Sequence, residues 1–559
     1  MDASKGAGAE REPRPVASVD TAVADPSSPP LSPTRPSAGA RSTWVRSVWT
    51  RIRPHVPGLA RHALLLAAFV GVAVMSRGAL IGSPAVLNPD EAELFAQARG
   101  ALRNPVPYTT WNTSTTGPMC VLIVALIGAL GFPLTIPFAH LLSSVLFGVL
   151  GYFGYVLAAR TSMGRVAALL ATAFWWLPMV FAIHGSVDFG ALQNEMIPIT
   201  LVVSLMLFRP DLLARRPWLY SVMGLLGALA IGSKYQMAPL VAVVLVVQLV
   251  LAGDLRWRTL VINAARFAAG ALAPALVLVG AMLISPNVDV SALRQTAAFL
   301  DYYGSRVPLG DRLHNTASVM SRTNVALLLV AVAWLAVLST RRVAALRLAL
   351  VGTGAVAVFL GGMGFGHYLI VFYLSVAMAF GLPLRPGARV VPFVRGTASS
   401  AAILVVLFVG GWLASFGPSV GLAERTKVSD LYRALTSDAT GLYPAIAPDC
   451  PAGSRVFVWG WASELYVFHD WENAFLFVQT QQQIEVAPNR EPGLAMVREV
   501  IDDDATDCVI DAVGSPFFAY GAEFSLTTYY PEVAPLLAAE YRRVEPGTPC
   551  EACAVYVRR

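Results

Sequence analysis

Long apolar runs separated by short basic segments dominate the chain from about residue 62 to residue 416. The runs HALLLAAFVGVAVMS and PLVAVVLVVQLVLAG approach the roughly 20 consecutive apolar residues that a helix needs to cross the hydrocarbon core. The pattern predicts a polytopic α-helical membrane protein with about 11–13 transmembrane helices. We expect the first helix at about 62–83 and the last at about 397–416.

The charged residues between the apolar runs predict the orientation of the chain. The segment RSTWVRSVWTRIRPHVPGLARH precedes the first span and contains no acid, so the positive-inside rule makes the N-terminus cytoplasmic. The same rule assigns RPDLLARRP, GDLRWR, STRRVAALR and LRPGARVVPFVR to the inner face. The outer face then receives the first loop (84–117), the region of Lys234, residues 285–318 and the stretch from Gly362 to His367.

One part of the membrane domain does not fit this alternation. Four apolar runs lie between residues 118 and 208, an even number, although the chain has to pass from outside to inside there. The run at 166–184 contains WWLP, and Pro178 is expected to break a helix. We therefore predict two short membrane helices in this run, with the 160–165 loop on the outer face.

Composition changes at both ends of the membrane domain (43–416). Residues 1–42 are rich in Pro, Ser and Ala and contain no aromatic residue, so we expect a disordered cytoplasmic tail. The first span follows without a cleavable signal-peptide pattern, which predicts a retained anchor. Residues 417–559 alternate short apolar runs with the amphipathic segment GLAMVREVIDDD, which is typical of a small α/β domain. The predicted topology makes this domain extracytoplasmic.

Four of the five cysteines lie in this C-terminal domain: Cys450, Cys508, Cys550 and Cys553. In an oxidising compartment an even set predicts up to two disulfides, with three possible pairings. Cys550 and Cys553 alone have the spacing of half a zinc site, but no His neighbours them. We expect disulfides here and predict no metal site.

The overall composition excludes some classes of partner. Of the 559 residues 56% are hydrophobic and 14% are charged, whereas soluble domains carry about a quarter charged residues. Most of the net charge of +6 lies in short loops that set orientation, so it does not indicate nucleic-acid binding. The glycine-rich GMGFG (362–366) has no strand before it, and no Walker or dinucleotide fingerprint occurs elsewhere. A nucleotide sugar is therefore not expected as a substrate.

Three acids, Asp90, Glu91 and Glu93, come directly after the first span. Asp90 and Glu93 have the spacing of a capping box, in which Asp90 accepts an early backbone N–H and Glu93 reaches back. A helix cap gives no role to Glu91. A cap is also possible anywhere in a protein, so capping does not explain why these acids lie at the outer membrane face. Two interpretations stay open: a helix cap, or a catalytic carboxylate whose position the helix start fixes.

One span leads to a first outer loop that opens with PDE and continues through VPY to TTGP. This order of features resembles the GT-C class of integral-membrane glycosyltransferases. Later segments also resemble the class: DFGALQNE (188–195), SKYQ (233–236), GHYLIVFYL (366–374) and VFVWGWASELYVF (456–468). The resemblance covers roughly 62–480. It is nearest to the family 39-like enzymes: protein mannosyltransferases, the aminoarabinose transferase of lipid A and rhizobial lipopolysaccharide galacturonosyltransferases.

The resemblance implies a membrane glycosyltransferase that takes a monosaccharide from a polyprenyl phosphate carrier. The acceptor would be a cell-envelope glycolipid, polysaccharide or protein, and a bacterial inner (plasma) membrane is the expected location. Asp90 corresponds to the proposed general base of the first loop, and Glu91 would position the acceptor or a cation. A carboxylate can take the proton of an acceptor hydroxyl during attack on the anomeric carbon, and such a single displacement inverts that centre. No cofactor is required; a divalent cation is compatible with the acidic pair but is not predicted.

The leaving lipid phosphate needs positive charge nearby, and three residues at the outer ends of spans are candidates: Lys234, Arg77 and His367. Lys234 is the best, because the positive-inside rule does not place a cation there. Lys234 and Arg77 would equally be explained by snorkelling to headgroups. His367 is also explained as a satisfied interfacial histidine. Tyr368 follows it in the same segment and joins the substrate-binding candidates.

Glu195 begins an apolar span, and Asp188 lies one to two helical turns before it. Both are candidates for sugar or acceptor binding, although an acid at a helix N-terminus is also explained by the helix dipole. Tyr108 and Trp111 in the first loop are able to stack on a sugar, but an interfacial aromatic belt explains them as well.

Two rival functions remain. A transporter or lipid-linked glycan flippase would be expected to show internal repeats and midplane polar residues, neither of which we find. A non-catalytic envelope assembly protein would use its outer domain for recognition. A common cavity lined by the first-loop acids and Lys234 would favour the enzyme.

Overall fold

The computed structural model describes residues 56–82, 86, 88–113, 116–161, 164–181, 191–321, 325–386, 449–513, 520–544 and 554–559. Residues 63–559 belong to one compact unit. The predictions made for the tail at 1–42, for Asp188, for Cys550 and Cys553, and for the last span at 397–416 lie outside the described residues. The domain boundary predicted between residues 416 and 417 also lies outside the described residues.

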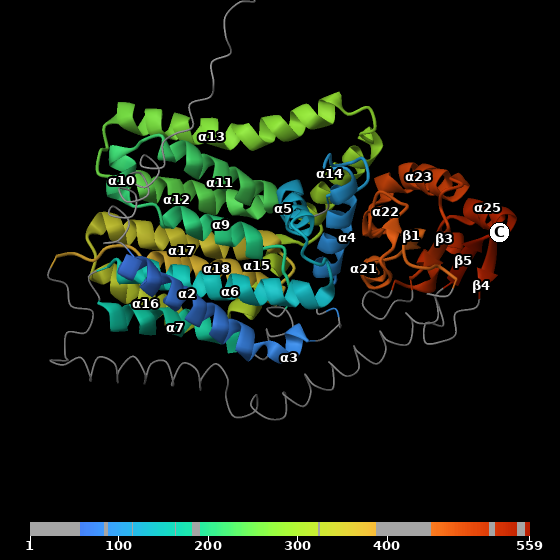
Figure 1. Ribbon diagram of the computed structural model, residues 1–559. Coiled ribbons are helices and arrows are strands. Elements are labelled where there is room, and N and C mark those ends of the chain that lie inside the picture. Colours follow the sequence, from blue (N-terminus) through green and yellow to red (C-terminus); the bar gives the residue numbers. More distant parts are fainter. Residues whose placement is uncertain are drawn as a thin grey trace, which may run out of the picture. The chain divides into compact units, whose positions relative to one another are not determined.

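The membrane part is built of helices (Figure 1). Its first half contains α2 (Val56–Ser76), α3 (Gly78–Ile81), α4 (Pro89–Arg103), α5 (Pro118–Ala129), α6 (Ile136–Ala159), α7 (Arg165–Phe181), α9 (Met196–Met206), α10 (Pro210–Arg215) and α11 (Leu219–Ser233). Its second half contains η2 (Tyr235–Met237), α12 (Ala238–Leu251), α13 (Trp257–Ile284), α14 (Val290–Ser305), α15 (Leu309–Ser321), α16 (Val325–Val337), α17 (Arg341–Gly361), η3 (Gly366–Tyr368) and α18 (Leu369–Phe380).

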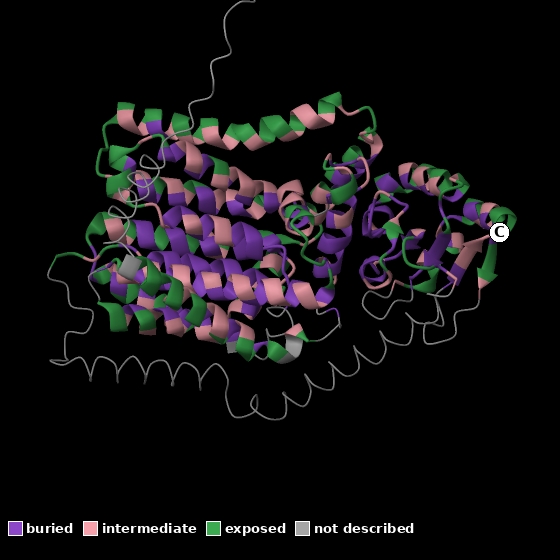
Figure 2. Cartoon of the chain, viewed as in Figure 1, coloured by how far each residue is buried: buried purple, intermediate pink, exposed green. Residues whose placement is uncertain are grey.

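Among the described residues, four helices are long and apolar enough to cross a membrane: α2, α6, α13 and α17. The number of candidate spans rises to five if α15 and α16 together form one bent span. Shorter apolar helices (α5, α7, α9, α11, α12 and α18) pack beside them. Figure 2 shows α18 buried along its length, whereas α13 exposes apolar side chains, as a lipid-facing helix does. These features confirm a polytopic helical membrane protein; the count of 11–13 spans stays a prediction.

Helix α7 corrects one prediction. It runs as a single helix from Arg165 to Phe181 and continues through Pro178, so the expected division of the 166–184 run into two helices is wrong over the described residues. Proline removes one backbone hydrogen bond, but helices within a membrane bundle tolerate this loss because neighbouring groups satisfy the freed carbonyl.

The C-terminal domain contains a five-stranded sheet in the order β2-β1-β3-β5-β4. The strands are β1 (Arg455–Trp459), β2 (Glu472–Asn473), β3 (Cys508–Asp511), β4 (Tyr541–Val544) and β5 (Ala554–Arg558). The helices are α21 (Glu464–His469), α22 (Gln481–Glu485), η4 (Ala487–Asn489), α23 (Arg490–Asp502), η5 (Ala522–Phe524), α24 (Leu526–Tyr529), η6 (Pro531–Val533) and α25 (Ala534–Glu540). β1 pairs in parallel with β2 and β3, and β5 is antiparallel to β3 and β4.

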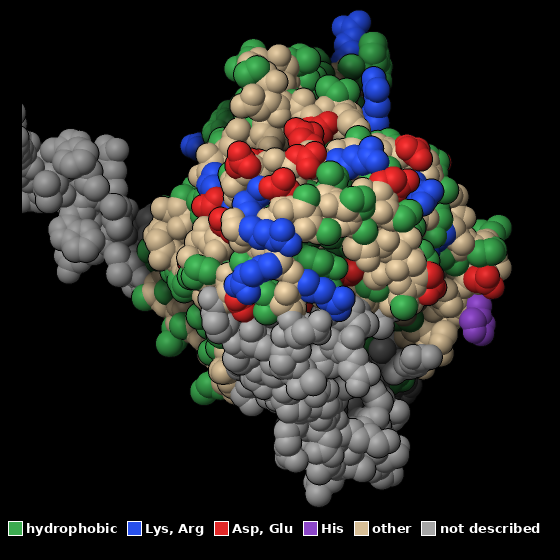
Figure 3. Space-filling view, turned by 90° about the vertical axis from the view of Figure 1, so that its right-hand side faces the viewer, with side chains coloured by type: hydrophobic (Ala, Val, Ile, Leu, Met, Phe, Trp, Pro, Cys, Tyr) green, Lys and Arg blue, Asp and Glu red, His purple; other side chains and the backbone are tan. Residues whose placement is uncertain are grey.

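Burial explains why the short apolar runs form this sheet. Val456 to Trp459 of β1 and all of β3 are buried, which requires cover on both faces of the central strands. A disulfide joins Cys450 to Cys508 and ties the start of the domain to β3. Figure 3 shows acidic and basic side chains interspersed over the visible face of this domain. The structure thus confirms the predicted α/β domain and resolves one of its disulfides.

The α/β domain docks on the membrane part through polar contacts with α4 and α14. Arg99 of α4 donates from Nη1 to the carbonyl of Tyr466 (2.8 Å) and forms an ion pair with Asp470 (3.0 Å). From α14, the side chain of Gln295 accepts from Gln483 Nε2 (3.0 Å), and its backbone carbonyl accepts from Asn489 Nδ2 (3.0 Å). The first loop, α14 and the C-terminal domain are therefore held together.

Asp511, at the end of β3, gives this domain a pH-dependent stability. Its carboxylate accepts the N–H groups of Leu526 (2.7 Å) and Val513 (3.3 Å), yet burial raises its pKa from 3.8 to about 7. Between about pH 4 and pH 7 the folded state holds a proton that the unfolded state has released. The bound proton therefore adds to the free energy of unfolding. This contribution is complete below pH 4 and is lost as the pH rises toward 7, by at most about 1.4 kcal/mol per pH unit.

We expect the variant Asp511→Asn to lose this dependence. Thermal unfolding of the purified protein, followed at several values between pH 4.5 and 7, measures it. Because burial lowers the pKa of His469 to about 4, that residue changes stability with pH in the opposite direction, so the difference between wild type and variant is the informative quantity. If the difference in stability between the wild type and Asp511→Asn is the same at every pH, Asp511 is not the source of the pH dependence.

Candidate active site

A cavity of about 200 Å³ lies where the first loop, the ends of several membrane helices and the α/β domain meet. We call it the first cavity. It is lined by Asn88, Pro89, Asp90, Glu93, Lys234, Phe299, Tyr303, Phe365, His367, Tyr368, Trp461, Gln479 and Gln481. Of the predicted site residues it brings together Asp90, Lys234, His367 and Tyr368. The first-loop acid and Lys234 share one cavity, which is the observation that favours an enzyme.

The start of α4 places Asp90 in this cavity. The helix lies crosswise at the end of the bundle (Figure 1). Its N-cap is Asn88, whose side chain accepts the N–H of Asp90 (2.9 Å), and Pro89 occupies the first turn. The prediction that Asp90 is itself the cap and that Glu93 reaches back is therefore wrong; Glu93 instead accepts from Gln97 Nε2 (3.0 Å). With Asn88 as the cap, Asp90 sits in the first turn, where the helix dipole favours a carboxylate.

Lys234 follows the last residue of α11 and forms a buried ion pair. Its Nζ lies 3.0 Å from Glu195 Oε1, and both side chains are almost fully buried. Gly117 of TTGP fixes this helix end: its N–H donates to the carbonyl of Ser233 (2.9 Å), and a Cβ there would lie 2.1 Å from the carbonyl oxygen of Gly232. Glu195 does not line the cavity itself, but it balances the charge of a lysine that does.

His367 and its neighbours form an aromatic wall. His367 Nε2 lies 4.0 Å from Glu195 Oε2, and its Nδ1 is buried with no hydrogen-bond partner among the described residues. The hydroxyl of Tyr368 lies 3.3 Å from that of Tyr303 on α14. Phe365 stacks on the His367 ring with centroids 5.5 Å apart. This wall offers one ring nitrogen and two hydroxyls next to the Lys234–Glu195 pair.

Among the lining side chains that sequence reasoning missed are Phe299, Tyr303, Trp461, Gln479 and Gln481. The first two lie on α14, within the outer segment 285–318 that we predicted without singling out its residues. The last three come from the α/β domain, and Trp461 lies within the VFVWGWASELYVF segment. The α/β domain therefore completes the cavity as well as covering it.

Glu91 points away from the first cavity and connects α4 to the bundle. Its Oε1 lies 3.1 Å from His140 Nε2 on α6, and its Oε2 accepts the N–H of Leu192 (3.1 Å). Both Glu91 and His140 are completely buried. Glu91 does not line the first cavity, so its contacts suit a positioning role beside Asp90.

We expect Glu91→Ala and Glu91→Gln to behave differently. Alanine leaves the buried Leu192 N–H and His140 without this carboxylate, at a cost of about 1–3 kcal/mol for each unsatisfied group. Glutamine retains an oxygen for the N–H and a second polar atom for His140, so it should keep most of the stability and activity. Thermal unfolding and sugar transfer measured on both variants test this. An inactive but fully stable Glu91→Gln would contradict a positioning role.

Three other predicted residues lie outside the first cavity. Arg77 is buried, donates from Nη2 to the carbonyl of Met179 (3.1 Å) and lies over the Phe147 ring (4.0 Å). The hydroxyl of Tyr108 lies 2.6 Å from Thr113 Oγ1. Trp111 is completely buried. Since neither aromatic ring faces lipid, an interfacial belt is the wrong explanation for them; both stabilise the first loop.

Burial raises the pKa of the Tyr108 phenol, which keeps it in the neutral, hydrogen-bonded form within that loop. Among the described residues no group of three or more His, Cys, Asp and Glu side chains is arranged to hold a metal ion.

Comparison with known proteins reveals a shared fold. No family model matches the chain, and no curated protein matches its sequence. Among solved structures, the chain is similar to ArnT from Cupriavidus metallidurans, which was crystallised with undecaprenyl phosphate. The TM-score is 0.52 at 15% sequence identity, and the match covers 88% of this chain and 97% of ArnT. The polytopic fold with a C-terminal α/β domain is thus an ArnT-like fold.

Proposed function

We propose that this protein is a membrane glycosyltransferase that moves a monosaccharide from a polyprenyl phosphate carrier to a cell-envelope acceptor. The observation that carries the proposal is the meeting of Asp90 and Lys234 in one cavity, within an ArnT-like fold. A general base and a cation are the two groups that such a transfer needs. Asp90 and Lys234 come from segments more than one hundred residues apart, so local sequence does not force them together.

Asp90 would act as the general base. An acceptor hydroxyl is a poor nucleophile, and a carboxylate within hydrogen-bond reach removes its proton as the oxygen attacks the anomeric carbon. The new glycosidic C–O bond forms while the bond from the anomeric carbon to the phosphate oxygen breaks. The phosphate keeps the electron pair of that bond, and Asp90 keeps the proton. Attack opposite the leaving group inverts the anomeric centre.

Lys234 would stabilise the negative charge of the departing lipid phosphate. Electrostatic stabilisation is strongest where a cation is fixed and shielded from water, and Lys234 is 4% exposed and held by Glu195. His367 and Tyr368 line the same cavity and offer further hydrogen bonds to phosphate or sugar. Glu195 acts through Lys234, and Glu91 acts through the position of α4; both are positioning residues.

Three observations favour a lipid-linked donor. The cavity lies at the ends of apolar helices, where a polyprenyl chain remains in the membrane while its phosphate reaches the headgroup plane. ArnT, whose fold this chain shares, was crystallised with undecaprenyl phosphate. The sequence carries no nucleotide-binding fingerprint. We place the reaction on the extracytoplasmic face because the charge distribution predicts the cavity there.

The donor can be identified in a strain that lacks this protein. We expect one polyprenyl phosphate sugar to accumulate in the membrane, and one sugar to be missing from the envelope glycans. Mass spectrometry of both fractions, with a complemented strain as the control, measures this. Unchanged carrier-linked sugars together with unchanged envelope glycans would contradict the proposed function.

A further inference from the structure

A second, larger cavity of about 550 Å³ lies at the opposite end of α4. We call it the second cavity. Residues of the first loop, the segment before α14 and the α/β domain line it: Arg103, Thr109, Thr110, Asn287, Asp289, Arg455, Glu472, Asn473, Ala474, Phe475, Leu476, Met496, Glu499, Val500 and Asp503. Its volume is within the range of small-molecule binding sites. The proposed reaction at Asp90 does not use it.

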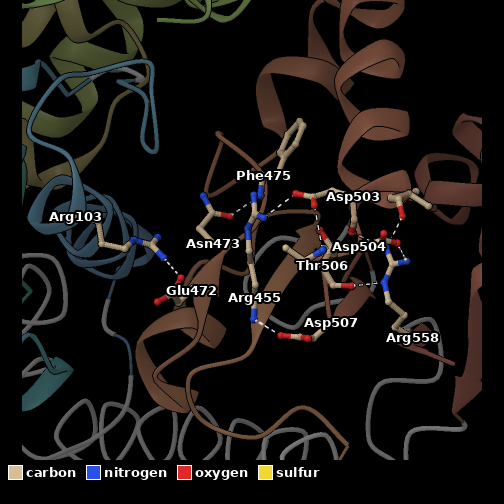
Figure 4. A network of polar contacts seen from close by, with 12 residues as sticks. Arg103, Arg455, Glu472, Asn473, Phe475, Asp503, Asp504, Thr506, Asp507 and Arg558 are labelled. Carbon is tan, nitrogen blue, oxygen red and sulfur yellow. Dashed lines mark hydrogen bonds and ion pairs between the residues drawn. The ribbon is translucent and has the colours of Figure 1, made fainter. Parts of the chain in front are cut away.

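Two ion pairs lie in the wall of the second cavity. Figure 4 shows Arg455 reaching toward Asp503, with Asn473 on its other side. Arg455 Nη1 lies 2.6 Å from Asp503 Oδ2, and Arg103 pairs with Glu472. These side chains are one-third to one-half exposed, so both arginines have an acidic partner and remain open to a ligand.

One polar group in this wall lacks a partner. Asn473 Oδ1 accepts the N–H of Phe475 (3.2 Å), which fixes the orientation of the amide. Its Nδ2 is buried and has no hydrogen-bond partner among the described residues. Buried polar groups are almost always hydrogen-bonded, so this N–H donor beside the cavity requires an acceptor that the described residues do not supply, from a bound ligand or from a water molecule.

The charge of the wall selects among ligands. Four carboxylates (Asp289, Glu472, Glu499 and Asp503) face two arginines, and both arginines are paired. A phosphate or uronic acid would therefore meet a net negative wall. Carboxylates, amides and threonine hydroxyls together suit a ligand with many hydroxyl groups that is neutral or carries an amine.

The two cavities lie at opposite ends of α4, and one segment of the α/β domain contributes residues to both. Asp90 and Arg103 are about 20 Å apart along the helix at a rise of about 1.5 Å per residue. Residues 472–476 line the second cavity, and Gln479 and Gln481 of the same segment line the first. A ligand that occupied both cavities would therefore be extended over about 20 Å.

We propose that the second cavity binds the part of the acceptor remote from the reacting hydroxyl, and that the acceptor is a neutral or amine-bearing glycan several sugar units long. The assignment of the ligand as acceptor rests on the proposed function; the assignment of a glycan rests on the cavity wall. Of the acceptors that the sequence left open, a glycolipid, a polysaccharide or a protein, the wall of the second cavity favours one with a glycan chain.

The test uses the full-length protein in nanodiscs and a panel of oligosaccharides of one to six units. The panel contains neutral, amine-bearing and uronic-acid series, and an unstructured peptide of similar length serves as the alternative ligand. Glu499→Trp fills the cavity from an exposed position on α23. Glu491→Trp is the matched control, since it makes the same change at an exposed position on the same helix outside the cavity.

Saturation-transfer NMR should show binding of neutral or amine-bearing oligosaccharides that strengthens with length. We expect Glu499→Trp to weaken it about tenfold and Glu491→Trp to leave it unchanged. In transfer assays Glu499→Trp should raise KM for the longer acceptors, and Glu491→Trp should leave that KM unchanged. Binding of the peptide or the uronic-acid series instead, or equal binding by both tryptophan variants, overturns the proposal. If oligosaccharide binding depends on Glu499 but no transfer occurs, the proposed function fails while the glycan site stands.

Discussion

Asp90→Asn is expected to abolish sugar transfer while leaving the protein folded. Asparagine has the shape of aspartate, and the contact of the Asn88 side chain uses the backbone N–H of residue 90, which the substitution keeps. The amide cannot accept the proton of the acceptor hydroxyl. General-base catalysis is worth about 10²–10⁴-fold, so kcat should fall by that factor with little change in the KM of the donor. Turnover of the carrier-linked sugar by purified protein measures the effect.

Asp301→Asn is a suitable control for this variant. Asp301 is exposed on α14, between two residues that line the first cavity, so the chemical change and its neighbourhood are comparable. It should keep wild-type turnover. Thermal unfolding of Asp90→Asn should match that of the wild type. An Asp90→Asn protein with normal turnover would remove Asp90 from the role of base.

Lys234→Met is expected to reduce both stability and activity, and a second change separates the two effects. Methionine leaves Glu195 as an unpaired buried charge, and breaking a buried ion pair from one side costs about 3–5 kcal/mol. The double variant Lys234→Met with Glu195→Gln no longer contains that charge, so its stability should return toward that of the wild type. Its activity should remain low, because the cation near the leaving phosphate is still missing.

Thermal unfolding and turnover of the single and double variants measure these expectations, with Lys234→Arg as the variant that retains the charge. Recovery of activity together with stability in the double variant would assign Lys234 a purely structural role. If the double variant does not regain stability, the unpaired charge of Glu195 is not what destabilises Lys234→Met.

The sequence was most informative about features that depend on residue type alone. Apolar length predicted the helical membrane domain, and short alternating runs predicted the α/β domain. The expectation that Asp90, Lys234 and His367 share one end of the bundle came from charge between spans, and all three line the first cavity. Hydrophobicity and charge act locally along the chain, which is why they can be read from it.

The errors concern features that depend on three-dimensional partners. Asn88 rather than Asp90 caps α4, because several polar residues in NPDEAE were equally able to cap. The role of Glu91 depends on His140 and Leu192, which lie 49 and 101 residues away. Gln479 and Gln481 reach the cavity only because the α/β domain docks on α4 and α14. No local pattern encodes such contacts.

Following one labelled sugar in proteoliposomes tests whether the protein transfers it from the carrier to a glycan. Purified wild-type protein is given the carrier-linked sugar that accumulates in the deletion strain, together with envelope glycan from that strain. We expect the label to move to the glycan with inverted anomeric configuration and free polyprenyl phosphate to be released in equal amount. The Asp90→Asn variant should do neither. Label that crosses the membrane still attached to its carrier, or a carrier-linked sugar that stays intact with wild-type protein, would contradict the proposed function.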